Sequence, residues 1–308
     1  MNTAVHTTDV VVVGSGPAGA SCALWLGLQG LRVTVLEQAP DTSALLRRLN
    51  FAQDWVLGQP QVSTAQLAID HTAHLRQHPS IRIQTSRTLV GGTRLSDGRL
   101  HLTCTEGDSL ITRYVVFATG LVSRPYAHAL EGDRLPLDAI ALTQQRERLQ
   151  GHRVLLLGGG DNAAENALFL AERGHAVTLW SRSALRARHE FREALQGSPV
   201  SVVIDPVMPT LGYNAAQQVW RAGHAVRHEQ MFDEVAVLFG FQPHREPVVK
   251  LAMSLNGPGA IAPDTLDITA LEPQGLYVAG DLAQRMHPCI STAIADGVEV
   301  ARRIAQRS

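Results

Sequence analysis

Four consecutive valines, Val10–Val13, follow Asp9 near the beginning of the chain. A continuous run of β-branched residues indicates a strand that is buried on both faces of a parallel sheet. The run leads into a glycine-rich stretch at 14–19, an Ala- and Leu-rich segment that ends near Gly30, and a second apolar run at 31–36. This order of apolar and turn residues predicts a strand, a tight turn, a helix and a second parallel strand.

The turn carries the G-x-G-x-x-G spacing through Gly14, Gly16 and Gly19. In a βαβ unit such glycines let the backbone approach a pyrophosphate at the helix N-terminus, and an acid after the second strand accepts hydrogen bonds from ribose hydroxyls. Glu37 stands at that place. The alternative is a merely tight strand-to-helix turn. We predict a dinucleotide site with contacts from Gly14, Gly16, Pro17, Ala18, Gly19, Glu37 and Gln38.

The same pattern recurs farther along the chain. A strand at 154–157, a glycine turn at 158–163, a helix at 164–173 and a strand at 175–180 follow one another. The three glycine positions of the first turn map at one constant offset onto Gly158, Gly160 and Ala163, as expected of an internal repeat. We predict a second dinucleotide site that uses Gly160, Asp161, Asn162 and Ala163.

The two copies differ at the position of the ribose-binding acid. The offset that aligns the glycines places Ser181 opposite Glu37, and Arg182 and Arg186 follow it. An acid there would repel a 2′-phosphate, whereas a guanidinium can bind it through two hydrogen bonds. The second site is therefore predicted to prefer NADPH to NADH. The alternative is that both arginines are solvated surface residues.

Composition and charge exclude several other classes of function. The 308 residues include 27 Lys and Arg against 28 Asp and Glu, so a net charge of −1 gives no field for nucleic acid or an anionic membrane. The glycine turn interrupts the uncharged stretch between Asp9 and Arg32, which argues against a membrane span. Three scattered cysteines fit neither a disulfide framework nor a zinc site, so we expect a cytoplasmic protein. His71, His74 and His78 could chelate a metal from one helix face, but a polar helix face is more often solvated than metal-binding, so we interpret them as a solvated stripe and assign no metal.

Four motifs in a fixed order resemble the low-molecular-weight thioredoxin reductase branch of the FAD-dependent pyridine-nucleotide oxidoreductases. They are the second glycine turn at 158–165, the basic stretch at 181–186, the strand ending at 117–120 and the late motif at 275–281. The resemblance covers nearly the whole chain. It implies an α/β fold of two Rossmann-like dinucleotide-binding domains in three ββα layers, with the NADPH domain inserted into the FAD domain, and a homodimer.

The expected domain boundaries derive from two similar strand ends, 114–120 and 234–240, each of which precedes a connector that contains proline. Proline stops a strand and stiffens the crossing between domains. We therefore expect a discontinuous FAD-binding domain at 1–120 and 244–308, and an NAD(P)H-binding domain at 121–243.

The resemblance also implies which residues meet the flavin. Asp281 would hydrogen-bond the ribityl chain. The start of the last helix, at 288–292, would place N–H groups near the flavin pyrimidine edge, where a helix N-terminus stabilises negative charge. The alternative role for Asp281 is a simple helix cap. The remaining implied contacts come from Asn50, Thr119, Gly120, Gly280, Cys289 and Ile290.

The chain departs from that family in its sulfur chemistry. Thioredoxin reductases carry a Cys-x-x-Cys pair just before the glycine strand of the NADPH domain, but the corresponding stretch at 137–146 contains no cysteine. A dithiol relay to thioredoxin is therefore excluded. The prediction is a FAD-dependent oxidoreductase that takes hydride from NADPH and passes electrons to a small molecule or a redox protein.

Several electron acceptors stay open. A ferredoxin or flavodoxin reductase of this type would carry a C-terminal extension, whereas the chain stops at Ser308 after its expected last helix, which disfavours that interpretation. A monothiol disulfide reductase would use Cys289, with packing against the flavin as the alternative role. Direct reaction with a quinone-like molecule or dioxygen would use His287 for proton transfer, unless it is a plain loop histidine. The last possibility is a non-catalytic, FAD-binding redox sensor.

Overall fold

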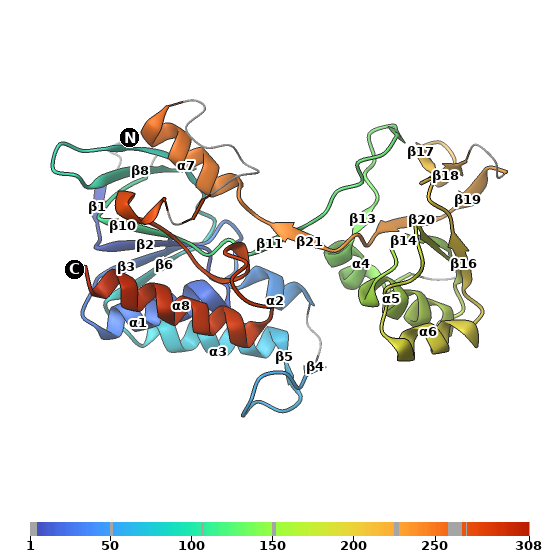
Figure 1. The fold of residues 1–308 in the computed structure, drawn as a ribbon, viewed down its shortest axis with the longest axis horizontal. Helices are drawn as coiled ribbons and strands as arrows, with labels where there is room; N and C mark the ends of the chain where they lie inside the picture. Colours follow the sequence, from blue (N-terminus) through green and yellow to red (C-terminus); the bar gives the residue numbers. More distant parts are fainter. Residues whose placement is uncertain are drawn as a thin grey trace. The chain divides into compact units, whose positions relative to one another are not determined.

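The computed structural model describes residues 5–49, 52–105, 108–149, 152–224, 228–257, 267–268 and 270–307. The chain forms two compact units (Figure 1). Unit 1 comprises Met1–Leu121 and Pro243–Ser308, and unit 2 comprises Val122–Gln242. Each unit is built on a parallel sheet in which a glycine turn connects a central strand to a helix.

Unit 1 is built around a five-stranded parallel sheet in the order β22-β10-β2-β3-β6. Its central strand β2 is the predicted valine strand, and all of its residues are buried because both faces of the sheet are covered. Val10 and Val12 pack against helices, whereas Val11 and Val13 pack against a second sheet. The strands are Val10–Val13 (β2), Val33–Leu36 (β3), Ile81–Gln84 (β6), Tyr114–Phe117 (β10) and Leu276–Val278 (β22).

Three layers therefore make up unit 1 (Figure 1). The helical layer consists of α1 (Pro17–Leu28), α3 (Thr64–Arg76) and α8 (Ile290–Ala305). The opposite layer is a four-stranded sheet in the order β1-β9-β8-β7 together with α7. Its elements are Val5–Thr7 (β1), Leu89–Arg94 (β7), Leu100–Cys104 (β8), Ser109–Thr112 (β9) and Glu246–Asn256 (α7).

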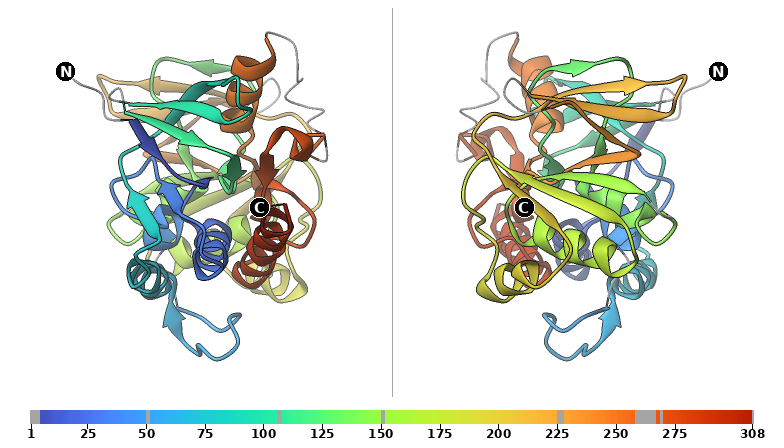
Figure 2. Two further views of the ribbon diagram at one scale, coloured as in Figure 1. Left: turned by 90° about the vertical axis from the view of Figure 1, so that its left-hand side faces the viewer. Right: turned by 90° about the vertical axis from the view of Figure 1, so that its right-hand side faces the viewer.

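Short elements complete unit 1. A hairpin of β4 and β5 projects beyond the helical layer (Figure 2). It carries the exposed side chains of Trp55 and Leu57. The short elements are Ala44–Leu49 (α2), Ala52–Gln53 (β4), Val62–Ser63 (β5), Glu272–Gln274 (η3) and Gly280–Leu282 (η4).

Unit 2 repeats the same plan. A five-stranded parallel sheet in the order β13-β20-β14-β15-β16 has helices on one face and the four-stranded sheet β12-β17-β18-β19 on the other. The helices are Ala139–Gln145 (α4), Asp161–Glu172 (α5) and His189–Gln196 (α6). The strands are Leu130–Glu131 (β12), Leu137–Asp138 (β13), Arg153–Leu157 (β14), Ala176–Ser181 (β15), Ser201–Ile204 (β16), Thr210–Asn214 (β17), Val219–Gly223 (β18), Gln230–Phe232 (β19) and Glu234–Val237 (β20). Among the residues described, none of the helices combines the length and the apolar character that a membrane span needs.

Two short strands, β11 (Leu121–Ser123) and β21 (Phe241–Pro243), pair where the chain passes between the units. Each follows a glycine with positive φ, which is +65° at Gly120 and +82° at Gly240. Glycine adopts this backbone region without steric cost. Both crossings can therefore turn sharply at the end of the preceding strand.

The expected strands and helices are present with small shifts at their ends. The first predicted helix is α1, and the strand after it begins at Val33 rather than at residue 31. In α3 the hydroxyl of Ser63 caps the helix by accepting a hydrogen bond from the Gln66 N–H at 3.0 Å. The predicted start of α5 was wrong, because Gly160 has an extended backbone and acts as the N-cap, so that the helix already begins at Asp161.

α1 and α8 pack closely within the helical layer of unit 1. A Cβ at Gly297 would lie 2.3 Å from the Ala18 carbonyl oxygen and 3.1 Å from the Cys22 nitrogen. The Ser21 hydroxyl donates a hydrogen bond to the Ile294 carbonyl oxygen at 2.9 Å. The close approach of the two helix backbones therefore requires glycine at position 297.

We expect Gly297→Ala to lower the free energy of unfolding by about 1–3 kcal/mol, because an added methyl group forces packed backbones apart. Urea denaturation of the full chain measures this loss. Gly91→Ala is the matched control, since the nearest atom to its Cβ would be the rotatable Ser254 hydroxyl oxygen at 3.3 Å. Equal losses in the two variants would contradict the packing role of Gly297.

Candidate functional site

The three glycines of the first turn have different surroundings. A Cβ at Gly14 would lie 2.4 Å from the Ala118 carbonyl oxygen, and a Cβ at Gly19 would lie 1.9 Å from the Gly14 carbonyl oxygen. Around Gly16, by contrast, no heavy atom of the described residues lies within 4 Å of an added Cβ. The outer two glycines therefore serve the packing of the turn, and the middle one leaves open space where a ligand can approach the backbone.

The second turn repeats this division of roles. A Cβ at Gly158 would lie 2.5 Å from the Leu238 carbonyl oxygen, and Ala163 is fully buried at the third position. The space within 4 Å of a Cβ at Gly160 is again free of described atoms. The structural equivalence of Gly16 and Gly160 supports the predicted internal repeat.

Both turns end at an uncapped helix N-terminus. Gly16 is the N-cap of α1 and Gly160 is the N-cap of α5, and neither helix has a side-chain hydrogen bond at its cap. The first N–H groups of a helix have no partner within the helix, and the helix dipole favours negative charge beside them. An open backbone at each of two helix N-termini fits the pyrophosphate groups of two dinucleotides.

Hydrogen bonds fix Glu37 directly after β3. One carboxylate oxygen, Oε2, accepts from the Ser15 hydroxyl at 2.6 Å, and the other, Oε1, accepts from the Ala39 N–H at 3.0 Å. The Ser43 N–H donates to the Ser15 hydroxyl oxygen at 2.7 Å and holds it in place. Gln38, beside Glu37, is exposed. A carboxylate oxygen accepts more than one hydrogen bond, so Oε1 retains capacity for a ribose hydroxyl.

Unit 2 has no acid at the equivalent place. Ser181 ends β15, and its hydroxyl donates to the Ser183 carbonyl oxygen at 2.7 Å. Arg182 and Arg186 are exposed, and neither guanidinium is paired with a side chain in the part of the chain that the structure describes. The Arg186 N–H donates to the Gly159 carbonyl oxygen at 2.7 Å, which places this residue beside the second turn. These uncommitted cations fit a 2′-phosphate.

The one acid in the first turn of α5 is already neutralised. The Asp161 carboxylate accepts from the Arg188 N–H at 2.7 Å and pairs with its Nε at 2.9 Å. Asn162 is exposed, and its carbonyl oxygen accepts from the Asn166 amide at 2.8 Å. The negative charge of Asp161 therefore does not cancel the attraction of this helix N-terminus for a phosphate.

Gly280 and Asp281 lie in η4, between β22 and α8. Gly280 has a φ of +73°, and a Cβ there would lie 2.6 Å from the Ala18 Cβ, so this segment is packed on the first turn of α1. Burial raises the pKa of the Asp281 carboxyl; His287 opposes this rise and Asp296 adds to it. The acid that the resemblance assigns to the flavin thus stands next to the open glycine turn.

Sequence reasoning missed the ion pair that holds this segment. Asp296 of α8 is buried, and its Oδ2 accepts from the Gly280 N–H at 2.7 Å. Its two carboxylate oxygens also accept from Nη1 of Arg285 at 2.8 Å. The one signal in the sequence is an acid within the apolar face of the last helix.

Cys289 is the N-cap of α8 and an exposed free thiol. Its Sγ lies 3.2 Å from the Thr292 hydroxyl oxygen, within hydrogen-bond distance, and also accepts from the Thr292 N–H at 3.5 Å. Hydrogen bonding with Thr292 lowers the pKa of the Cys289 thiol, against a smaller opposing effect of burial. His287 is exposed nearby, and Ile290 begins the helix. The thiol is therefore accessible and predisposed to ionise.

The strand end after β10 also reaches the first turn. The Thr119 nitrogen would lie 3.3 Å from a Cβ at Gly14, and the Thr119 hydroxyl donates to the His244 carbonyl oxygen at 2.7 Å. Gly120 follows with its positive φ. Asn50, the remaining predicted flavin contact, lies outside the described residues. Unit 1 thus brings Gly14, Thr119 and the η4 segment together.

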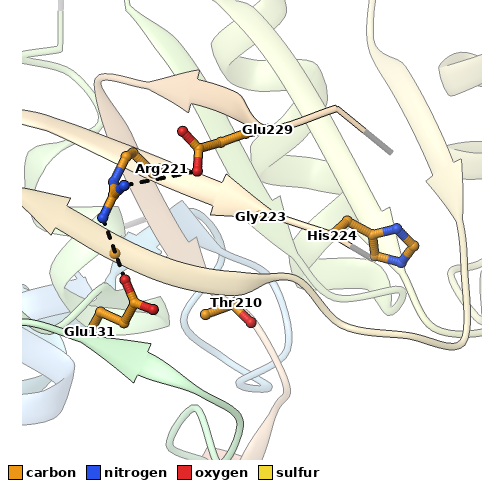
Figure 3. Close-up of a pocket in the computed structure, with 7 residues that line it drawn as sticks. Glu131, Thr210, Arg221, Gly223, His224 and Glu229 are labelled. Atoms are coloured by element: carbon orange, nitrogen blue, oxygen red, sulfur yellow. Dashed lines mark hydrogen bonds and ion pairs between the residues drawn. The ribbon is translucent and has the colours of Figure 1, made fainter. Parts of the chain in front are cut away.

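A pocket of about 430 Å³ in unit 2 has a different character (Figure 3). Arg221 lies between Glu131 and Glu229, with N–O distances of 3.4 and 3.9 Å. Two carboxylates around one guanidinium give the wrong charge for a phosphate group. The pocket is lined by Glu131, Thr210, Gly212, Arg221, Gly223, His224 and Glu229, and none of these is a predicted coenzyme residue.

Comparison with known proteins identifies the family. Residues 8–297 match the pyridine nucleotide-disulphide oxidoreductase family. The chain belongs to this family. The oxidoreductase is 23% identical over 299 residues to a ferredoxin–NADP reductase of Symbiobacterium thermophilum. This alignment covers 89% of this chain and 84% of the relative. It is also 25% identical over 308 residues to a thioredoxin reductase of Mycoplasma genitalium. This second alignment covers 96% of this chain and 94% of the relative.

A solved structure shows the same fold as this oxidoreductase. The bacillithiol disulfide reductase Bdr of Staphylococcus aureus superposes with a TM-score of 0.74 at 14% identity, over 98% of this chain and 99% of the other. The predicted α/β fold and the resemblance to thioredoxin reductases are thereby confirmed. The protein is thus a pyridine nucleotide-disulphide oxidoreductase by family, and FAD and NADPH are the cofactors that the sequence predicts for it. The two open turns with uncapped helices fit both cofactors.

This oxidoreductase has no vicinal thiols where a dithiol relay would need them. The stretch 137–146 forms β13 and α4 and contains no cysteine. Of the three cysteines, Cys22 and Cys104 lie in the hydrophobic core, where burial raises the pKa of both thiols. Cys289 is the one of the three cysteines that is exposed.

We expect iodoacetamide to alkylate Cys289 before Cys22 and Cys104, with a rate midpoint below the pH at which an ordinary cysteine ionises. Hydrogen bonding with Thr292 stabilises the thiolate, so more of it is present at a given pH. Thr292→Val should move the midpoint upward by roughly half to one pH unit. Mass spectrometry of the alkylated peptides over a pH series measures both rates. Identical profiles in the parent and Thr292→Val would contradict this role of Thr292.

Proposed function

We propose that the chain moves a hydride from NADPH, bound by unit 2, to FAD, bound by unit 1, and that the acceptor then meets the flavin directly. The observation that carries the assignment is the contrast between two otherwise equivalent glycine turns. Glu37 beside the first turn suits the ribose hydroxyls of FAD. Arg182 and Arg186 beside the second suit the 2′-phosphate of NADPH.

The residues of unit 1 bind and orient the flavin nucleotide. When bound, FAD supplies the chemistry of accepting and releasing an electron pair. The helix N-terminus at Gly16 would hold the pyrophosphate, and Asp281 would hydrogen-bond the ribityl chain. The N-terminus of α8, from Cys289 onward, would favour negative charge on the adjacent flavin ring. The close packing of the Asp281 segment on α1 supports this arrangement.

We propose a one-electron redox protein of the ferredoxin class as the acceptor. The missing thiol pair at 137–146 removes the route to thioredoxin. A ferredoxin–NADP reductase is among the relatives, and the similarity extends over 84% of its length. The expected C-terminal extension of a ferredoxin reductase was the argument against this acceptor. We give the similarity to the relative more weight than that argument.

A second candidate acceptor is a disulfide attacked by Cys289. The exposed thiol with a lowered pKa at a helix N-terminus favours it. The thiolate would form a mixed disulfide and release one thiol, and the electron pair carried by the flavin would then release the second. The expected homodimer rests on the resemblance and the expected cytoplasmic location rests on the scattered cysteines, and both stay predictions.

Anaerobic mixing with NADPH is expected to bleach the visible absorbance of the bound flavin. Ferredoxin should then restore the absorbance equally fast in the parent and in Cys289→Ser, while a panel of disulfides, quinones and air serves for comparison. Reoxidation by a disulfide that is lost in Cys289→Ser would instead establish the second candidate. A flavin that NADPH leaves unbleached would refute hydride transfer.

Arg182→Ala should raise the KM for NADPH about tenfold and leave the KM for NADH nearly unchanged. A hydrogen bond to a charged group contributes about 1.5–3 kcal/mol, and about 1.4 kcal/mol corresponds to tenfold in affinity. Steady-state kinetics with both nucleotides measures the ratio. Arg192→Ala, which removes an exposed arginine of α6, is the control. Equal increases for the two nucleotides would remove the 2′-phosphate assignment.

A further inference from the structure

An ion pair between the buried Asp296 and the partly exposed Arg285 clamps the segment that carries Asp281. Asp296 is 3% exposed, and its Oδ2 accepts from the Gly280 N–H at 2.7 Å. Nη1 of Arg285 donates to both carboxylate oxygens of Asp296 at 2.8 Å. Nη2 of the same guanidinium donates to the Val278 carbonyl oxygen at 3.1 Å, at the end of β22. One arginine and one aspartate thus connect β22, η4 and α8.

The stability of α8 alone does not explain an acid at this position. The neighbouring buried residues on the same face are apolar, namely Ala293, Val300, Ala301 and Ile304. Burying the Asp296 carboxylate has a desolvation cost, and an apolar residue of similar volume is often at least as stabilising at such a position. Among the hydrogen bonds that Asp296 accepts, the one from the Gly280 N–H satisfies a buried backbone group, and a buried N–H group needs a partner.

The clamped segment lies against the first glycine turn. Gly280 has a φ of +73°, and a Cβ there would lie 2.6 Å from the Ala18 Cβ. Gly297 follows Asp296, and a Cβ there would lie 2.3 Å from the Ala18 carbonyl oxygen. The residues on both sides of the clamp therefore touch the helix turn to which FAD is assigned.

We propose that Arg285 and Asp296 are positioning residues for the flavin site. They hold Gly280 and Asp281 in the geometry that the bound nucleotide requires, so the segment need not reorganise when FAD binds. Preorganisation of this kind strengthens binding by lowering its conformational cost. The clamp acts through Asp281 and touches no reacting atom. This inference rests on the proposed FAD site in unit 1.

The dissociation constant of FAD, measured by the release of flavin fluorescence from the diluted holoprotein, tests the clamp. Arg285→Met should raise it at least about tenfold, by analogy with the loss of metal affinity when residues that orient metal ligands are removed. It should also displace the visible absorption bands of the remaining bound flavin. Arg285→Lys keeps the charge and should recover part of the affinity. Arg303→Met is the matched control, because Arg303 of α8 pairs with Glu272 of η3 and not with Asp296. We expect it to change the dissociation constant less than about twofold.

A second variant separates positioning from folding. Arg285→Met alone leaves the Asp296 carboxylate buried and unpaired, which destabilises the chain. The double variant Arg285→Met/Asp296→Leu removes both charges, so the Tm of its apoprotein should exceed that of Arg285→Met. Its dissociation constant for FAD should nevertheless stay raised, because the Gly280 N–H has lost its acceptor. An FAD affinity equal to that of the parent in this double variant would overturn the clamp.

The clamp and the proposed function fail in different ways. A parent protein that takes up no FAD would overturn the proposed function and the clamp together. A parent that binds FAD, with variants of Arg285 that bind it equally well, would overturn the clamp alone.

Discussion

The approach of backbone to backbone at the first glycine turn is the constraint on which the rest of unit 1 depends. The carbonyl of Ala118 lies against Gly14, and Gly280 and Gly297 both lie against Ala18. Four segments that are far apart in the sequence can meet there because these positions carry no side chain, and a packed interior has no room for an added methyl group. The open space at Gly16 is therefore bordered by backbone that tertiary packing fixes.

Unit 2 repeats the same scaffold, and we propose that it has a different nucleotide specificity. Its turn also packs an outer glycine, Gly158, against a neighbouring carbonyl oxygen and leaves Gly160 open. The two sites differ at the end of the second strand of each βαβ unit, where one carries a fixed Glu37 and the other carries Ser181 and an exposed Arg182. Fold alone does not determine function, so we propose that these few side chains distinguish the two nucleotide sites.

The sequence was sufficient to predict the strands and the glycine turns because their signals are local. Val10–Val13 is continuously apolar because both faces of β2 are buried, and such a run is visible without any knowledge of the fold. The hydrogen bonds that hold the candidate site were not predictable. Ser43 reaches Ser15 across a loop, and Asp296 meets Gly280 from the middle of a helix, so both pairs depend on tertiary placement. The identity of the electron acceptor has no local sequence signal, because a surface built from distant segments recognises the acceptor.

The central claim is that two nucleotides are held at two separate turns, and one titration experiment tests it directly. Gly16 and Gly160 have φ values of −63° and −95° and open space around an added Cβ, so the backbone at either position accepts leucine, whose side chain would occupy space that a nucleotide needs. In isothermal titrations of the apoprotein, Gly16→Leu should abolish FAD binding and leave NADPH binding intact, and Gly160→Leu should do the reverse. If Gly16→Leu still binds FAD like the parent, or if Gly160→Leu still binds NADPH like the parent, the two-site assignment is wrong.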